Sequence, residues 1–160
     1  MSREMIMKEF IDSIRDRYDT VLIDCMPSLG IMTINALVAA DSVIIPTSTA
    51  YLPVKGLQQL LSTISKVRKQ LNKSLRIEGI LLTMVDLRTV YARDMMNAVL
   101  KTYGTGSGVG VFESFIPYSV RAAESTAAGV SIFRHDPDGK VAAAYMDFGK
   151  ELMGHEAETR

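Results

Sequence analysis

Four short apolar runs, separated by stretches long enough for helices, constrain the fold of this chain most strongly. The runs are TVLID (Thr20–Asp24), SVIIP (Ser42–Pro46), LRIEGILLTMV (Leu75–Val85) and VFESFIP (Val111–Pro117). Short apolar runs of this kind are typical of strands buried in a parallel sheet. Strands that alternate with helices form βαβ units. The sequence therefore predicts an α/β fold: a parallel, doubly wound sheet with helices on both faces.

The stretches between these runs carry the spacing of amphipathic helices. One helical face is formed by Met7, Phe10, Ile11 and Ile14. A longer apolar stripe spans 54–71, and further helices are expected at 31–40, 91–103 and 120–128. The segment HDPDGK predicts the start of the last helix, with Asp136 as N-cap and Pro137 at the first helical position. We expect one domain over residues 1–154 and a flexible tail at 155–160.

Composition narrows the class of protein. With 160 residues and 48% hydrophobic content, the chain is long enough to bury a core without disulfides. Eighteen basic and eighteen acidic residues give zero net charge, which argues against a generally basic nucleic-acid coat but not against a local patch. The single cysteine, Cys25, excludes an internal disulfide and fits a reducing compartment. Because no apolar run approaches the length of a membrane span, we expect a cytoplasmic protein with no membrane partner.

The segment VLIDCMPSLG is the most informative motif. An apolar run that delivers Asp24 to its end, followed by a Pro/Ser/Gly loop, is how P-loop nucleotidases place a carboxylate beside Mg²⁺. Many other α/β proteins end a strand with an Asp that caps the next helix. The motif by itself leaves both interpretations open.

The order and spacing of several motifs resemble the ParA/Soj family of chromosome- and plasmid-partition ATPases, which is related to MinD. These motifs are VLIDCMPSLG, NALVAADSVIIP, GLQQLL, IEGILLTMVDLRT, FIPYSVRAAE and HDPDGKVAAAY. The resemblance runs from about Tyr18 to Leu152. It implies a deviant-Walker P-loop fold that binds ATP with Mg²⁺, dimerises around nucleotide and binds DNA non-specifically. It also implies a ParB-like partner that stimulates hydrolysis.

The resemblance also assigns site residues. Asp24 matches the Walker B aspartate, which helps to hold Mg²⁺ through water. Pro27, Ser28 and Gly30 match the switch loop near the γ-phosphate, where the family usually has two prolines and this chain has Met26-Pro27. The strand ends that flank adenine are matched by Thr83, Met84 and Pro117. The arginines that contact DNA in some family members are matched by Arg88, Arg93 and Arg121; for Arg121, an ion pair with Glu124 is the open alternative.

One departure from the family limits these expectations. The 160 residues contain no KGGxGKT segment, and the glycines of 104–110 lack a following Lys-Ser/Thr and suit a surface loop. The second acidic motif of the family is also absent. The chain thus resembles the C-terminal half to two-thirds of a partition ATPase, an incomplete P-loop fold without its N-terminal strand and Walker A loop. Without that strand, the run at 20–24 would have an open edge, so we expect self-association or completion by another polypeptide.

The missing loop also bears on activity. Hydrogen bonds to charged groups contribute about 1.5–3 kcal/mol each, and micromolar affinity amounts to only about 8 kcal/mol. We therefore expect that this chain by itself neither binds ATP tightly nor hydrolyses it. The alternative function is a non-catalytic DNA- or partner-binding module derived from such an ATPase.

A group of basic residues near the end of the long helix is open to two interpretations. The group consists of Lys66, Arg68, Lys69, Lys73 and Arg76. It is either a solvated helix end, where cations are favoured by the helix dipole, or a contact surface for DNA.

Overall fold

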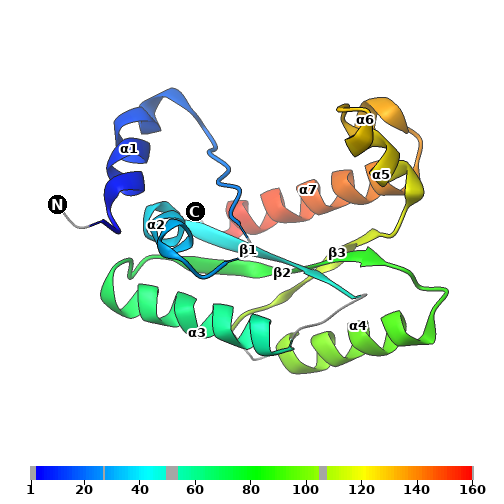
Figure 1. The fold of residues 1–160 in the computed structure, drawn as a ribbon, viewed down its shortest axis with the longest axis horizontal. Coiled ribbons are helices and arrows are strands. Elements are labelled where there is room, and N and C mark those ends of the chain that lie inside the picture. The colour runs from blue at the N-terminus through cyan, green and yellow to red at the C-terminus, as the bar shows by residue number, and fades with distance from the viewer. Residues whose placement is uncertain (1–2, 27, 50–53, 105–107, 160) are drawn as a thin grey trace. The chain divides into compact units, whose positions relative to one another are not determined.

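A parallel sheet forms the frame of the computed structural model, which describes residues 3–26, 28–49, 54–104 and 108–159; the side chains of 54–55 and 155–159 are not described. The strands are β1 (Ser42–Ser48), β2 (Arg76–Val85) and β3 (Val111–Pro117), in the order β1-β2-β3 (Figure 1). Strand β2 runs parallel to β3, with Ile80 opposite Val111 and Val85 opposite Pro117. The α/β class with a parallel sheet is confirmed.

The chain divides into two compact units. Unit 1 consists of Met1–Val43 and Pro53–Ile77, and unit 2 of Ile44–Leu52 and Glu78–Arg160. Each unit is described by itself below.

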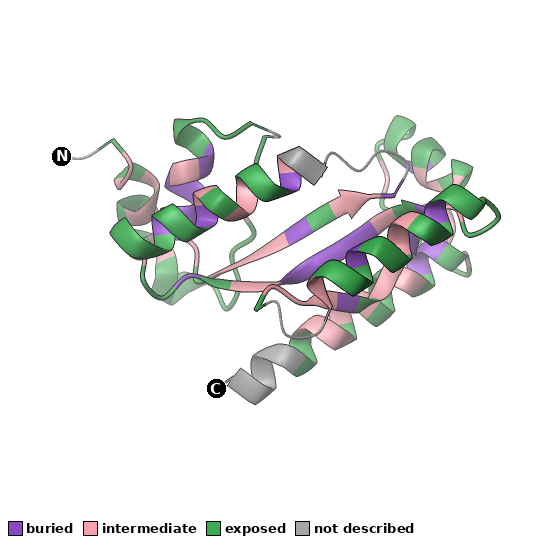
Figure 2. Ribbon diagram, turned by 90° about the horizontal axis from the view of Figure 1, so that it is seen from below, coloured by how far each residue is buried: buried purple, intermediate pink, exposed green. Residues whose placement is uncertain are grey.

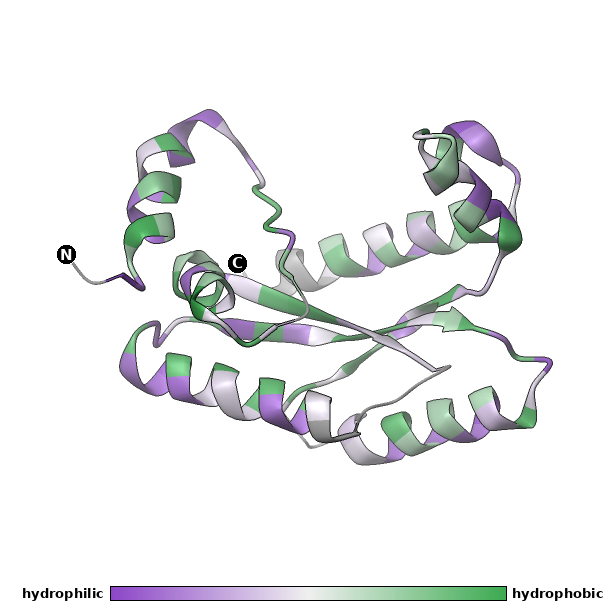
Figure 3. Cartoon of the chain, viewed as in Figure 1, coloured by the Kyte–Doolittle hydropathy of each residue, from purple (hydrophilic) through white to green (hydrophobic). Residues whose placement is uncertain are grey.

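The predicted strand at 20–24 is wrong. These residues belong to neither a helix nor a strand, and the side chain of Leu22 is 86% exposed. Figure 3 shows the apolar stretch on the connection between the first two helices. A strand is held by hydrogen bonds to a neighbouring strand, and no described segment pairs with this one. Apolar composition alone does not make a strand here.

Pro46 does not end its strand, contrary to expectation. Strand β1 continues to Ser48, and Pro46 itself is exposed. Since β1 lies at the side of the described sheet, a residue without an N–H group removes no hydrogen bond that the strand must make on that side.

Unit 1 contains the helices α1 (Ile6–Ile14), α2 (Ile31–Ala39) and α3 (Val54–Gln70) and the 3₁₀ turn η1 (Arg15–Arg17). Helix α1 is fastened to α2 by Asn35, whose Oδ1 accepts from Met7 N at 3.2 Å and whose Nδ2 donates to Arg3 O at 2.8 Å. Arg15 donates to both carboxylate oxygens of Asp41, at 2.8 and 2.7 Å. The helix predicted from the spacing at residues 7–14 is confirmed.

The turn after α3 is fixed by one amide side chain. Nδ2 of Asn72 lies 3.0, 3.2 and 2.8 Å from the carbonyl oxygens of Leu37, Val38 and Ala40 at the end of α2. Leu75, three residues later, is completely buried. The carbonyls that a helix end leaves unpaired are thereby satisfied, and the end of α3 is held in place.

Unit 2 contains α4 (Val90–Tyr103), α5 (Val120–Ala127), α6 (Ile132–His135) and α7 (Lys140–Thr159). Figure 1 shows α4 and α7 on opposite faces of β3, as a doubly wound sheet requires. Leu81, Phe112 and Ile116 pack with Val141 of α7, and the rings of Phe112 and Phe148 meet edge to face at 5.0 Å. Ile80 and Leu82 alternate with Leu81 and so face the other side; both are buried, as Figure 2 shows for the middle of the sheet.

The start of the last helix differs from the prediction. Helix α7 begins at Lys140, and Asp136 is instead the C-cap of the short helix α6, which the sequence analysis did not predict. Asp136 N donates to Ile132 O at 2.9 Å, so its backbone already belongs to the preceding helix. At its other end, α7 continues through Thr159, into the stretch expected to be a tail.

The outer edge of β3 is covered by a side chain from α7. The two carboxylate oxygens of Glu151 accept hydrogen bonds from Glu113 N at 2.7 Å and from Ser114 N at 2.9 Å. Backbone groups on a sheet edge need such partners.

Candidate functional site

A pocket of about 780 Å³ lies in unit 2 at the carboxyl ends of β2 and β3. Its walls come from three segments: Val85–Arg88, Glu113–Val120 without Ile116, and the first turns of α7 with Lys140, Ala143, Ala144 and Asp147. Ligands of parallel α/β sheets bind at this end of the strands. The volume is that of a small-molecule site.

Two loops form the mouth of the pocket and are tied to each other. Tyr118 N donates to Val85 O at 3.0 Å, directly after the paired residues Val85 and Pro117. The N-cap of α4 is Thr89, whose Oγ1 accepts from Ala92 N at 3.2 Å, and the N-cap of α5 is Ser119, whose Oγ accepts from Arg121 N at 3.1 Å. The segments around the pocket are therefore held by the N-caps of two helices and by the paired ends of two strands.

An ion pair fixes the charge beside the pocket. Arg88 donates through Nε to Oδ1 and through Nη2 to Oδ2 of Asp86, both at 2.8 Å. This fork, with the Arg88 backbone N–H, lowers the pKa of Asp86 from 3.8 to about 2 and raises the pKa of Arg88. Asp86 is thus a carboxylate at all physiological pH values.

The expected base-flanking residues lie at these strand ends, but only one of them lines the pocket. Pro117 is part of its wall, whereas Thr83 and Met84 are not. Met84 has a φ of 52°, the left-handed region that side chains other than glycine adopt at a cost. Its side chain is 52% exposed. A strained backbone at a strand end is a feature that recurs at functional sites.

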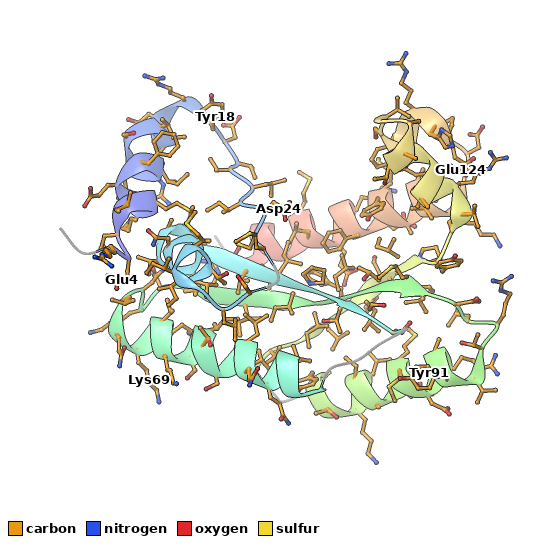
Figure 4. All side chains as sticks on the ribbon, viewed as in Figure 1. Glu4, Tyr18, Asp24, Lys69, Tyr91 and Glu124 are labelled. Atoms are coloured by element: carbon orange, nitrogen blue, oxygen red, sulfur yellow. The ribbon has the colours of Figure 1, made fainter. Side chains whose placement is uncertain are left out.

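The expected magnesium and switch residues belong to unit 1. Asp24 lies on the exposed connection between α1 and α2 (Figure 4), and no described residue pairs with its carboxylate. Gly30 is the N-cap of α2, and Ser28 closes a tight turn by donating its N–H to Met26 O at 2.7 Å. Thr33 Oγ1 donates to Ser28 O, which ties this turn to the first turn of α2. Pro27 lies outside the described residues.

The three arginines expected at a DNA surface all have local partners in unit 2. Arg88 holds Asp86, and Arg93 Nη1 donates to Leu87 O at 2.7 Å. Arg121 Nη1 lies 3.1 Å from Glu124 Oε2, so the ion pair considered as the alternative for Arg121 is formed. All three residues are exposed.

Sequence reasoning missed the contribution of α7 to the pocket. Lys140 and Asp147 stand seven residues apart and so share a helical face. Nothing in the local sequence marks them, because their place in the wall depends on how α7 packs on β3. Tyr118 was missed too, although it adjoins the expected residue Pro117.

Comparisons with known proteins show which proteins this chain is similar to. A family model described as an AAA domain matches residues 1–77. The sporulation initiation inhibitor protein Soj of Bacillus subtilis is 41% identical over 97% of this chain and 60% of its own length. The chromosome partitioning protein ParA of Myxococcus xanthus is 40% identical over 95% of this chain and 52% of its own.

This chain is similar to proteins of the ParA/Soj family over nearly its whole length. It spans between half and two-thirds of the length of these relatives. A solved structure titled cobyrinic acid a,c-diamide synthase from Mycobacterium smegmatis, with bound ADP and magnesium, matches with a TM-score of 0.80 and 32% identity. The match covers 99% of this chain and 56% of that one.

The donor groups fit one kind of magnesium site and not another. The described residues hold no cluster of three or more His, Cys, Asp or Glu side chains that could bind a metal ion. Mg²⁺ bound with a nucleotide takes one or two carboxylates and completes its shell with phosphate oxygens and water. An unpaired, exposed Asp24 suits that second kind of site.

Among the described residues, no helix is both long and apolar enough to cross a membrane.

Proposed function

We propose that this chain supplies the base-binding and magnesium-side parts of a ParA/Soj-type partition ATPase. The observation that carries the proposal is the pocket at the carboxyl ends of β2 and β3, whose walls include Pro117 and the Asp86–Arg88 pair. A planar base fits between apolar walls, and a few fixed polar groups around it select its orientation. The bound nucleotide of a structurally similar protein supports an adenine nucleotide as the ligand.

The resemblance to the family supports the roles proposed for single residues. Pro117 flanks the base in the pocket, and Thr83 and Met84 belong to the neighbouring strand end. Asp24 holds water on Mg²⁺, and Ser28 and Gly30 belong to the switch loop that serves the terminal phosphate. Pro27 belongs to the same switch loop. When bound, ATP supplies the reactive phosphoanhydride; the chain binds and orients it.

The proposal includes weak binding by the chain alone. None of its 160 residues forms a KGGxGKT loop, so the backbone donors and lysines that such a loop directs at phosphates have no counterpart in this sequence. We therefore propose that the isolated chain neither binds ATP tightly nor hydrolyses it. ATP binding and hydrolysis in the cytoplasm would then require a further polypeptide segment that supplies the phosphate loop.

A pocket-filling variant tests the nucleotide site. Ala143 is exposed in the pocket wall, and Ala143→Phe would occupy the space; Ala127→Phe on α5, outside the pocket, is the matched control. With a fluorescent ATP analogue and Mg²⁺, we expect a dissociation constant weaker than micromolar, raised at least about tenfold by Ala143→Phe and unchanged by Ala127→Phe. Binding that is equal in both variants, or undetectable at millimolar analogue, would overturn the assignment.

Self-association is the second part of the proposal. In unit 1, the side chains of Leu22, Met26 and Met32 are 86%, 65% and 57% exposed. Apolar surface of this kind on an unpaired, extended segment favours association between chains. Light scattering should show a dimer that Leu22→Asp dissociates and that Leu100→Asp, an exposed leucine on α4 in unit 2, does not. A monomer at all concentrations would contradict this part.

ParB-like and DNA partners remain proposals that follow from the family. The alternative function, a non-catalytic DNA- or partner-binding module, is favoured by the absent phosphate loop. Thermal unfolding with ATP and Mg²⁺ separates the two, because a bound ligand must raise the midpoint.

A further inference from the structure

Strand β1 has one backbone edge with which no described strand pairs. It lies at the side of the described sheet, and β2 is its neighbour on the other side. Asp41 O accepts from Arg76 N at 3.1 Å, and Thr49 N donates to Thr83 O at 3.4 Å, so β1 is tied to β2 at both ends. Because backbone groups alternate in direction along a strand, the odd-numbered residues of β1 face β2 and the even-numbered residues face outward.

The usable part of this outer edge runs from Ser42 to Pro46. Ile44 lies in its middle and directs its N–H and carbonyl groups outward, while its side chain packs against the core cluster of unit 2. Pro46 is exposed and has no N–H to donate. A proline on a sheet edge limits how far another strand can pair along it. The edge is therefore fixed in place and suits a short partner strand.

Residues 20–24 are a short apolar segment that lacks a strand to pair with. They belong to neither a helix nor a strand, and Val21 and Leu22 are 40% and 86% exposed. Tyr18, just before them, has extended backbone angles of −138° and 135°, and Figure 4 labels Tyr18 and Asp24 along this connection. Three successive apolar side chains suit a strand that is covered on both faces. The segment and the outer edge of β1 each lack what the other supplies.

We infer that two copies of this chain exchange these segments, so that residues 20–24 of each copy add as a strand to the outer edge of β1 in the other copy. The inference rests on the self-association proposed above and deepens it by naming the surface that receives the exposed Leu22. Backbone hydrogen bonds hold an added strand, and its alternate side chains gain neighbours on the two faces of the sheet.

A second copy is the partner that leaves no segment and no edge unused. Each copy donates one segment and receives one, which is the reciprocal contact of a twofold dimer. Both surfaces are on the same polypeptide, so the occupant is present at the same concentration as the edge. The exchange needs no nucleotide, whereas the family resemblance implies a dimer that forms around nucleotide.

A peptide with the sequence of residues 18–24, YDTVLID, tests the edge directly. It is added to the whole chain carrying Leu22→Asp, which places a charge in the chain's own segment and leaves β1 unchanged. Hydrogen exchange measured by NMR should show the amide of Ile44 slowed at least about tenfold by the peptide, because its outward N–H gains an acceptor. The amide of Ile45, which faces β2, is the matched control and should not change.

Two modified peptides separate strand pairing from simple apolar contact. N-methylation of Leu22 or of Ile23 blocks one backbone N–H and leaves every side chain in place. Because successive N–H groups point to opposite sides of a strand, only one of the two peptides should lose affinity, by at least about tenfold. In the parent chain without nucleotide, the Ile44 amide should become protected as the protein concentration is raised and the dimer forms.

Four results would overturn the inference. A dimer of the parent chain in which the Ile44 amide stays unprotected would put the contact elsewhere and leave the proposed self-association standing. A dimer that forms only with ATP and Mg²⁺ would exclude the exchange, and protection of residues 20–24 that is independent of concentration would show pairing within one chain. A monomer at all concentrations would end both the inference and the proposed self-association, while the ATP site is tested separately by Ala143→Phe.

Discussion

Residues 20–24 and strand β2 carry the same kind of side chains, but β2 is paired and largely buried whereas residues 20–24 are unpaired and largely exposed. Both are rich in Val, Ile and Leu, and both deliver an aspartate at their end, Asp24 and Asp86. Strand β2 has a neighbour on each side, and its Ile80 and Leu82 are buried. Residues 20–24 have no paired neighbour, and Leu22 is exposed. The difference teaches that hydrogen-bonding neighbours, more than composition, decide which apolar run becomes a strand.

Hydrogen exchange should show the largest contrast. Ile80 N donates to Gly110 O at 3.1 Å in the middle of the sheet. Its amide should exchange only through global opening, at a cost of about 5 kcal/mol or more, whereas the amides of Val21 and Leu22 should exchange with protection near zero. Equal protection of the two segments would break the comparison.

Truncation of one leucine in each segment gives the next contrast. Leu82→Ala should lower the free energy of unfolding by about 2–5 kcal/mol, because it leaves a cavity among buried side chains. Leu22→Ala should change it by no more than about 0.5 kcal/mol. Urea unfolding of dilute protein measures both. A cost for Leu22→Ala above that of Leu82→Ala would mean that the 20–24 segment is packed in solution.

The β3 edge provides a third, smaller test. Glu151→Ala removes the acceptor of two backbone N–H groups and should cost about 1–3 kcal/mol. Glu151→Gln, which keeps one amide oxygen as acceptor, should cost less. If both variants unfold like the parent chain, water replaces the carboxylate without loss.

The aspartates that end the two apolar segments, Asp24 and Asp86, differ in their ion pairing, and this contrast gives the smallest expected change in stability. Asp86 is held by Arg88, while no described residue pairs with Asp24. Because the pKa of Asp86 is lowered, its contribution to stability is present above about pH 4 and is lost as pH falls through about 2. NMR titration should give a pKa of about 2 for Asp86 and a value nearer 3.8 in Arg88→Gln. An unchanged pKa in the variant would remove Arg88 as the cause.

These contrasts also explain what could be predicted from the sequence. The strand at 111–117 and the helix over residues 31–39 were predictable, because their patterns agree with the neighbours they have. The run at 20–24 was not, because its pattern presupposes a partner that the described chain does not provide. The start of α7 was misplaced since Asp136 caps the helix before it.

The residues of the candidate site also divide into those that could be predicted from the sequence and those that could not. Pro117 was predictable as a strand end in a parallel sheet, where ligands bind. Lys140 and Asp147 were not, because only the packing of α7 on β3 brings a helix that begins 23 residues after Pro117 into the wall. The basic residues Lys66, Arg68, Lys69 and Lys73 were visible in the sequence, but that all four are exposed became clear only from the structure.

The carboxylate of Glu151 has a consequence for how copies of this chain can combine. A sheet exposed at both sides can add strand upon strand and grow into a fibre. Here two N–H groups of β3 are already occupied by a side chain of the same molecule, so pairing of another strand at this edge would first require Glu151 to leave. A sheet that is blocked at one edge adds strands at the other edge only, so the self-association proposed above would stop at a pair.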